Sequence, residues 1–155
     1  MAAIVGGVLA TGLAALIVPC ILRRSSRFTL MRVNGMQRFS ASHTGQYTDS
    51  VEEAAQALQA GGLVAFPTET VYGLGAHAFD ELAVKRIFEV KGRPLTDPLI
   101  VHVDSLASAE RLVSLELEGL ELLRKLATAF WPGPLTIVAP ACATLPSMVT
   151  AGTGN

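Results

Sequence analysis

The sequence is poor in cysteine, has no acidic residue before Asp49 and lacks the common nucleotide-binding motifs. Its two cysteines, Cys20 in an apolar run and Cys142 in a proline-bounded loop, make neither a disulfide framework nor a zinc site, which favours a reducing compartment. Neither a G-x-x-x-x-G-K-S/T loop nor a G-x-G-x-x-G fingerprint is present. No nucleophile–base triad can be assembled from the sequence either.

Charge is also missing from residues 2–22, which are mostly apolar and long enough to cross a bilayer as a helix. The arginine- and serine-rich, acid-free segment that follows resembles an organelle-import peptide. We therefore expect residues 1–48 to be a targeting peptide or a membrane anchor, with a mis-assigned start codon as the third alternative. The expected location is cytoplasmic or mitochondrial, and membrane contact would run through residues 2–22.

From Asp49 onward the charge balance reverses, with 7 basic residues against 13 acidic residues, or −6. A nucleic-acid-binding surface generally needs a concentrated basic face, so this balance argues against RNA as the principal partner. Half of all residues are hydrophobic, and 155 residues suffice for one domain of ordinary size. We expect residues 49–155 to form that domain.

Hydrophobic periodicity in residues 49–155 predicts helices that alternate with short apolar strands. The expected helix caps are Ser50 and Ser105, the second helix is expected to start near Asp80, and Gly61 and Gly92 are expected at the ends of the first two helices. The fourth expected helix carries one buried face of Leu120, Leu123, Ala127 and Phe130. The expected strands are residues 63–66, 99–103 and 135–139. Continuous apolar strands predict an α/β domain whose sheet is covered on both faces, and residues 144–155 read as a loop.

The segment P-T-E-T-V-Y-G-L-G (residues 67–75) is the first candidate for chemistry. It directly follows a buried strand, where open α/β sheets bind ligands, and its hydroxyls belong to Thr68, Thr70 and Tyr72. Gly73 and Gly75 would let the backbone approach a ligand closely. The alternative is a turn in which the hydroxyls cap nearby backbone groups.

The second candidate is K-G-R-P followed by D-P-L-I-V-H. Lys91 and Arg93, held by Gly92 and a proline, form a compact site for a polyanion. Equally, both cations can simply offset the dipole at a helix C-terminus. His102 lies in an apolar strand, where a histidine is either a hydrogen-bonded core residue or a ligand contact.

The third segment, W-P-G-P-L-T from Trp131, predicts a rigid corner between a helix and a strand, with the indole in the core.

In this order, P-T-E-T-V-Y-G-L-G, K-G-R-P-x-x-x-P-L-I-V-H and F-W-P-G-P-L-T resemble the YrdC family of threonylcarbamoyl-AMP synthases, from about residue 50 to residue 155. The resemblance implies a twisted open α/β sheet, like that of DHBP synthase, around a deep, positively lined cavity. It implies a nucleotidyltransferase that makes threonylcarbamoyl-AMP and pyrophosphate from L-threonine, bicarbonate and ATP. Mg²⁺ would enter with ATP, held by phosphates and water, and a separate transferase complex would then modify tRNA.

Carried over position by position, the resemblance assigns roles to eight residues. Those expected to bind threonine are Thr68, Thr70, Tyr72 and His102. Those expected to bind ATP are Lys91, Arg93, Asp97 and Asn155, although Asn155 stands where the family often has threonine. The reaction needs no protein nucleophile, so no catalytic acid, base or metal ligand is assigned.

The family continues beyond the equivalent of Asn155 with a strand bearing a threonine-contacting arginine, and later with a Ser-x-Asn motif. We therefore expect a C-terminally truncated domain with little or no activity alone. Two further readings stay open: a non-catalytic protein that binds double-stranded RNA, and the carbamoyl-adenylating module of hydrogenase maturation. The latter normally lies in larger chains with zinc-finger-like cysteine motifs, which this sequence lacks.

Overall fold

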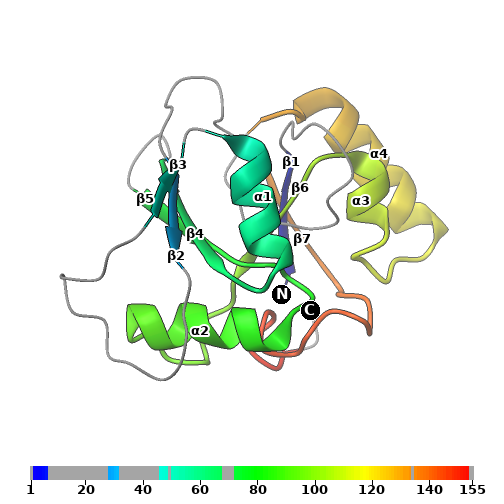
Figure 1. The fold of residues 1–155 in the computed structure, drawn as a ribbon. Coiled ribbons are helices and arrows are strands. Elements are labelled where there is room, and N and C mark those ends of the chain that lie inside the picture. The colour runs from blue at the N-terminus through cyan, green and yellow to red at the C-terminus, as the bar shows by residue number, and fades with distance from the viewer. Residues whose placement is uncertain are drawn as a thin grey trace.

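The computed structural model describes residues 2–6, 28–31, 46–48, 50–67, 72–133 and 135–153. Its helices are α1 (Val51–Gln59), α2 (Glu81–Lys91), α3 (Leu106–Glu110) and α4 (Leu117–Phe130) (Figure 1). Its strands are β1 (Ala2–Gly6), β2 (Phe28–Met31), β3 (Gln46–Thr48), β4 (Leu63–Pro67), β5 (Tyr72–Gly75), β6 (Ile100–Val103) and β7 (Thr136–Ala139). This mixture of helices and strands confirms the expected α/β class.

The described strands form two separate sheets, seen at the left and centre of Figure 1. One sheet has the order β6-β1-β7, in which β1 is parallel to β6 and antiparallel to β7. The other has the order β3-β2-β4-β5 and is antiparallel throughout. The first candidate motif therefore lies on one sheet, at the ends of β4 and β5, whereas the second begins at the end of α2 and reaches the other sheet at His102 on β6.

Three of the seven described strands lie in residues 1–48, the part that we set apart from the domain on sequence grounds. Within it, β1 separates β6 from β7, and β2 pairs with β4. Extended backbone at residues 2–6 differs from the apolar helix expected there, and the remainder of residues 7–22 lies outside the described residues. Among the described parts of the chain, no helix combines the length and hydropathy needed to cross a membrane.

The helix starts expected from the sequence are confirmed in atomic detail. Ser50 Oγ accepts a hydrogen bond from the Glu53 N–H at 3.2 Å, and Ser105 Oγ accepts one from Ser108 at the same distance. Asp80 Oδ1 accepts two, from the N–H groups of the second and third residues that follow it, at 3.0 and 3.1 Å. Each cap satisfies backbone donors that have no partner inside the helix.

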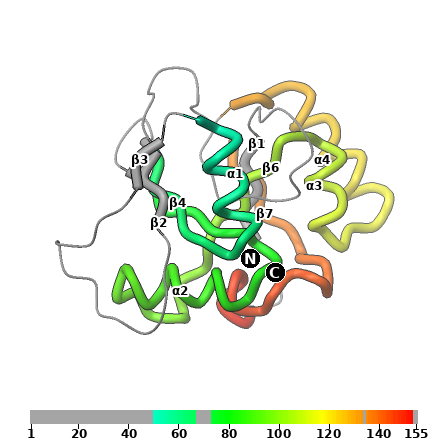
Figure 2. Tube along the Cα trace, in the orientation of Figure 1, coloured from blue at the N-terminus to red at the C-terminus, as the bar shows by residue number. Residues whose placement is uncertain are grey.

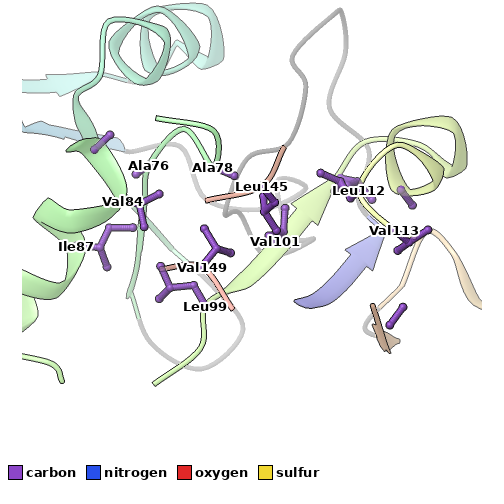
Figure 3. Packing of buried hydrophobic residues seen from close by; sticks show 14 of the residues in the cluster. Ala76, Ala78, Val84, Ile87, Leu99, Val101, Leu112, Val113, Leu145 and Val149 are labelled. Carbon is purple, nitrogen blue, oxygen red and sulfur yellow. The ribbon is translucent and has the colours of Figure 1, made fainter. Parts of the chain in front are cut away.

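A continuous core joins α2, β6, α3 and α4, and Figure 3 shows part of it. The largest fully buried side chains of the described residues are Leu63, Ile87, Leu112, Leu123, Val64, Val84, Val101 and Val149, and all of these except Val64 belong to this core. Val149 comes from the C-terminal segment expected to be a loop. That segment is indeed without helix or strand, but its turns pack into the core, and the Leu99 N–H donates to the Val149 carbonyl at 2.9 Å. The red trace in Figure 2 accordingly returns beside the segment that follows α2.

At its described residues, one face of the β6-β1-β7 sheet is only partly covered, contrary to the expectation that both faces are covered. Val101 and Val103 belong to the core with Leu112 and Leu123 of the α3–α4 region. On the opposite face, Ile100 is 42% exposed and Val138 is 49% exposed. Both pair with Ala3 of β1, so they lie in one row across the sheet.

Phe130 is a second correction, because its side chain is 57% exposed and not part of the buried α4 face. Leu123 and Ala127 are buried as expected, and Leu120 is partly buried. The last residue of α4 lies beyond the packed part of the helix, where the chain turns toward β7. Helical periodicity assigns a residue to a face, but it does not say how far along the helix that face is covered.

Candidate nucleotide and amino-acid site

The K-G-R-P corner is built by the way α2 ends. Gly92 adopts the left-handed conformation, with φ of 59°, and its N–H donates to the Glu89 carbonyl at 3.3 Å. The Arg93 N–H reaches back to the Phe88 carbonyl at 3.0 Å. This pair of bonds is the Schellman arrangement that commonly ends helices. It fixes the backbone of Arg93 immediately after the last helical turn.

Replacing Gly92 with alanine tests how much this corner depends on its left-handed residue. A Cβ at Gly92 would meet no atom within 4 Å, so the cost would be conformational and not steric. We expect Gly92→Ala to lower the free energy of unfolding by about 1 kcal/mol, whereas Gly92→Asn should cost less because asparagine tolerates this conformation better. Urea denaturation measures both, and an unchanged midpoint for Gly92→Ala would contradict the assignment.

Arg93 and Asp97 form the closest ion pair of this corner. Pro94 and Asp97 close a turn through the Asp97 N–H and the Pro94 carbonyl at 3.1 Å. Arg93 Nε donates to Asp97 Oδ2 at 2.8 Å, with the two side chains 39% and 44% exposed. Lys91 is also exposed. The corner therefore presents two cations to solvent, one of them oriented by a carboxylate, in a form that suits phosphate oxygens.

His102 lies on β6, five residues after Asp97, and is a polar residue among the apolar residues of this strand. Burial lowers its pKa from 6.5 to about 4, so the imidazole is neutral near pH 7. Its Nδ1 atom is buried and has no hydrogen-bond partner among the described residues. Because buried polar atoms nearly always have partners, an orphaned ring nitrogen indicates a place where a ligand would supply one.

The register places His102 on the same face of the sheet as the exposed Ile100 and Val138, although its own imidazole is largely buried. Val5 of β1 pairs with His102 on one side and with Thr136 of β7 on the other. His102 is two residues from Ile100 along β6, so both lie on the same face. Sequence reasoning did not single out Thr136 as a neighbour of His102, because only strand pairing across β1 brings the two into one row.

The P-T-E-T segment joins β4 to β5 in an antiparallel hairpin, in which Pro67 pairs with Tyr72. Thr68 and Thr70 lie outside the described residues, as does Asn155, so their assigned contacts stay predictions. The same holds for the side chain of Tyr72, of which only the backbone is described.

Gly73 has a structural explanation that differs from the close ligand approach expected from the sequence. It pairs with Phe66 across the hairpin, and a Cβ at Gly73 would lie 2.5 Å from Phe66 Cε2. The absent side chain therefore makes room for the Phe66 ring. Cross-strand packing of this kind is a common reason for glycine in a strand.

The W-P-G-P-L-T segment forms the expected corner. Trp131 packs against the core while partly exposed, and its Nε1–H donates to the Leu135 carbonyl at 2.9 Å. This bond closes the turn that leads from α4 into β7. The segment therefore acts as architecture for the strand that carries Thr136.

Among the described residues, no group of three or more His, Cys, Asp or Glu side chains is placed to hold a metal ion. The described part of the site consists instead of an exposed cationic corner and a neutral, partly buried imidazole on the strand that follows it. Such a site can bind a polyanion and a small polar ligand without a protein nucleophile.

Comparison with known proteins accounts for this combination. The Sua5/YciO/YrdC family model, described as "Telomere recombination", matches residues 56–155. The chain belongs to this family. The matched residues contain the three candidate segments together with the Arg93–Asp97 pair and His102.

Individual members of the Sua5/YciO/YrdC family are also similar to this chain. The chain is 57% identical over 99 residues to the threonylcarbamoyl-AMP synthase of Pyrococcus abyssi, covering 64% of this chain and 28% of that protein. It is 48% identical over 90 residues to the Bacillus subtilis threonylcarbamoyl-AMP synthase, covering 58% and 25%. The crystal structure of P. abyssi Sua5 complexed with L-threonine matches with a TM-score of 0.59 and 53% identity, over 66% of this chain and 29% of that chain. The chain thus spans little more than a quarter of the length of these relatives.

Proposed function

We propose that this chain supplies part of the substrate site of an L-threonylcarbamoyladenylate synthase. Its reaction would join L-threonine, bicarbonate and ATP to give threonylcarbamoyl-AMP and pyrophosphate, for use by a tRNA-modifying transferase complex. One observation carries the proposal: an anchored cationic corner leads directly into a strand with an orphaned, neutral histidine, within a segment 57% identical to a threonylcarbamoyl-AMP synthase.

The proposed chemistry needs positioning and charge stabilisation more than a protein nucleophile. The threonine amine attacks bicarbonate, and loss of water leaves a carbamate. A carbamate oxygen then attacks the α-phosphorus of ATP, and pyrophosphate departs. Groups that hold both substrates in line and offset phosphate charge can provide most of the acceleration in such a transfer.

The described residues divide these tasks between them. Lys91 and Arg93 are exposed cations that would hold the phosphates and stabilise the charge on the departing pyrophosphate. His102 would offer its unpartnered Nδ1 to the hydroxyl or ammonium group of threonine. A neutral imidazole suits this position because a charged one would repel the ammonium group.

Mg²⁺ would enter with ATP and offset phosphate charge, held by phosphate oxygens and water. This fits a donor set in which Asp97, the carboxylate of the cationic corner, is already paired with Arg93. The roles of Thr68, Thr70 and Tyr72 toward threonine, and of Asn155 toward ATP, form part of the same proposal.

Removing the two cations tests the nucleotide half of the site. We expect Lys91→Ala with Arg93→Ala to weaken ATP binding by the 155-residue chain by on the order of 100-fold, because two charge-assisted contacts are lost. Isothermal titration calorimetry with ATP measures this. The matched control removes two other exposed cations, Lys85→Ala with Arg124→Ala, and should change ATP affinity less than about threefold.

Turnover is best measured in a fusion that adds the part of the P. abyssi relative beyond its match to this chain. We expect pyrophosphate release that requires both threonine and bicarbonate, and that falls in the Lys91/Arg93 double variant. Pyrophosphate exchange that persists without threonine would favour the carbamoyl-adenylating alternative. Equal ATP affinity in the double variant and its control would contradict the proposed site.

A further inference from the structure

We infer that Asp97 positions Arg93 for the polyphosphate and does not itself contact the phosphates, an inference that rests on the proposed function. The decisive contact is the 2.8 Å bond from Arg93 Nε to Asp97 Oδ2. It joins Arg93, whose backbone is fixed directly after α2 by its bond to the Phe88 carbonyl, to the carboxylate four residues later. Family resemblance alone gives Asp97 a nucleotide contact and says nothing of this pairing.

The geometry of the guanidinium explains how the bond to Asp97 could favour phosphate binding by Arg93. Arginine has five N–H donors in a planar fork, and the Nε–H points along one edge. When Asp97 occupies that edge, the two terminal nitrogens remain for a bidentate contact with phosphate oxygens. Among the described residues, neither terminal nitrogen of Arg93 has a hydrogen-bond partner. The free part of the fork is therefore the part that phosphate recognition uses.

Asp97 is unsuited to a direct phosphate contact for an electrostatic reason. An ionised carboxylate only accepts hydrogen bonds, and the oxygens of a polyphosphate also accept, so the two groups repel each other. Paired with Arg93, the same carboxylate lowers the local positive charge while it restricts the guanidinium. The net effect on binding therefore depends on whether orientation or charge dominates, and the two predict opposite signs.

The surrounding backbone favours orientation. Arg93 is held on one side by its N–H bond to the Phe88 carbonyl, and Asp97 by its own N–H bond to the Pro94 carbonyl. Both ends of the ion pair therefore come from fixed backbone. By contrast, Lys85 and Glu89 on the surface of α2 have the same four-residue spacing but lie 3.9 Å apart. Pre-ordering one long side chain saves entropy that binding would otherwise cost.

The test compares Asp97→Asn with Glu89→Gln, which removes an equal charge nearby without touching Arg93. Inorganic pyrophosphate and ATP are the probes, with affinities from calorimetry. We expect Asp97→Asn to weaken binding of both probes by about tenfold, and Asp97→Glu to recover part of that loss. Glu89→Gln should leave affinity unchanged or raise it slightly. Since the pair is half-exposed, the thermal midpoint of Asp97→Asn should hardly move.

A second readout does not depend on nucleotide binding. The NMR signal of Arg93 Nε–Hε should be ordered in the wild-type chain and lose that order in Asp97→Asn. If Asp97→Asn binds pyrophosphate as well as the wild type or better, while the wild type binds ATP, the positioning role is wrong and the proposed function stands. If the wild-type chain binds neither probe, the proposed function fails, and this inference fails with it.

Discussion

The free energy of unfolding is expected to fall by about 3 kcal/mol as the pH is lowered from 6.5 to 4, through His102 alone. Burial holds the pKa of this imidazole at about 4 in the folded chain, against 6.5 for an exposed histidine. Between those values the unfolded chain binds a proton that the folded chain does not, so acid favours unfolding. The contribution is present above pH 6.5, is lost progressively as the pH falls through this window and becomes constant only well below pH 4.

Urea denaturation at a series of pH values, compared with His102→Gln, isolates this effect from the carboxylates that titrate in the same range. The difference between the two proteins should change by about 3 kcal/mol across the window, and the direct NMR pKa of His102 should lie near 4. Parallel stability curves for the two proteins would show that the imidazole is not buried in a neutral state.

A substitution at His102 can also distinguish a role in stability from a role in ligand binding. At pH 7, His102→Leu replaces the imidazole and its unpartnered Nδ1 with an apolar side chain of similar size. The fold should therefore be as stable or more stable. The same variant should bind threonine poorly if the imidazole is a ligand contact. Stability that rises as binding falls is typical of residues retained for a site and not for the core.

The second large effect is expected at Ile4. Its strand β1 lies in the middle of the β6-β1-β7 sheet, where Ile4 pairs with Val101 on one side and Ile137 on the other. Proline at this position removes a ladder hydrogen bond and clashes with extended pairing. We expect Ile4→Pro to lower the free energy of unfolding by about 3 kcal/mol or more, and to increase amide hydrogen exchange in β6 and β7.

The control places proline at Thr48, on the edge strand β3 of the other sheet, and should leave exchange in β6 and β7 unchanged. The comparison bears on the role predicted for residues 1–48. If residues 1–48 were a removable targeting peptide or a membrane anchor, neither substitution would change the stability of the β6-β1-β7 sheet. Equal stability of Ile4→Pro and the wild type would therefore support the predicted separation of this segment from the domain.

Much of the fold could be predicted from the sequence because it depends on interactions between residues that are close together in the chain. The caps at Ser50, Asp80 and Ser105 act within three residues of themselves, and Gly92 ends its helix through bonds to the preceding turn. The K-G-R-P corner was predictable for the same reason. Its alternative role, offsetting the helix dipole, uses the same residues and is separated from phosphate binding only by the binding experiments above.

Features that depend on which strands pair were predicted less well. Ile100 and Val138 lie in one row of the sheet because both pair with Ala3, and both side chains are exposed. The sequence predicted instead that both faces of the sheet are covered. Gly73, which is predicted to let a ligand approach, also makes room for Phe66 across a hairpin, and the sequence did not indicate this contact. In each case the relevant neighbour comes from another strand, so the pattern along one strand does not reveal it.

The sequence by itself determined the helices and their caps, the cationic corner after α2 and, through three motifs in order, the family. Tertiary structure alone decided that an N-terminal strand separates β6 from β7, that Val149 completes the core and that the Nδ1 of His102 is buried with no partner in the described part of the chain. The physical reason is the distance along the chain over which each interaction acts. Capping and periodicity act over three or four residues, whereas burial and the desolvation that lowers the pKa of His102 depend on segments far apart in the chain.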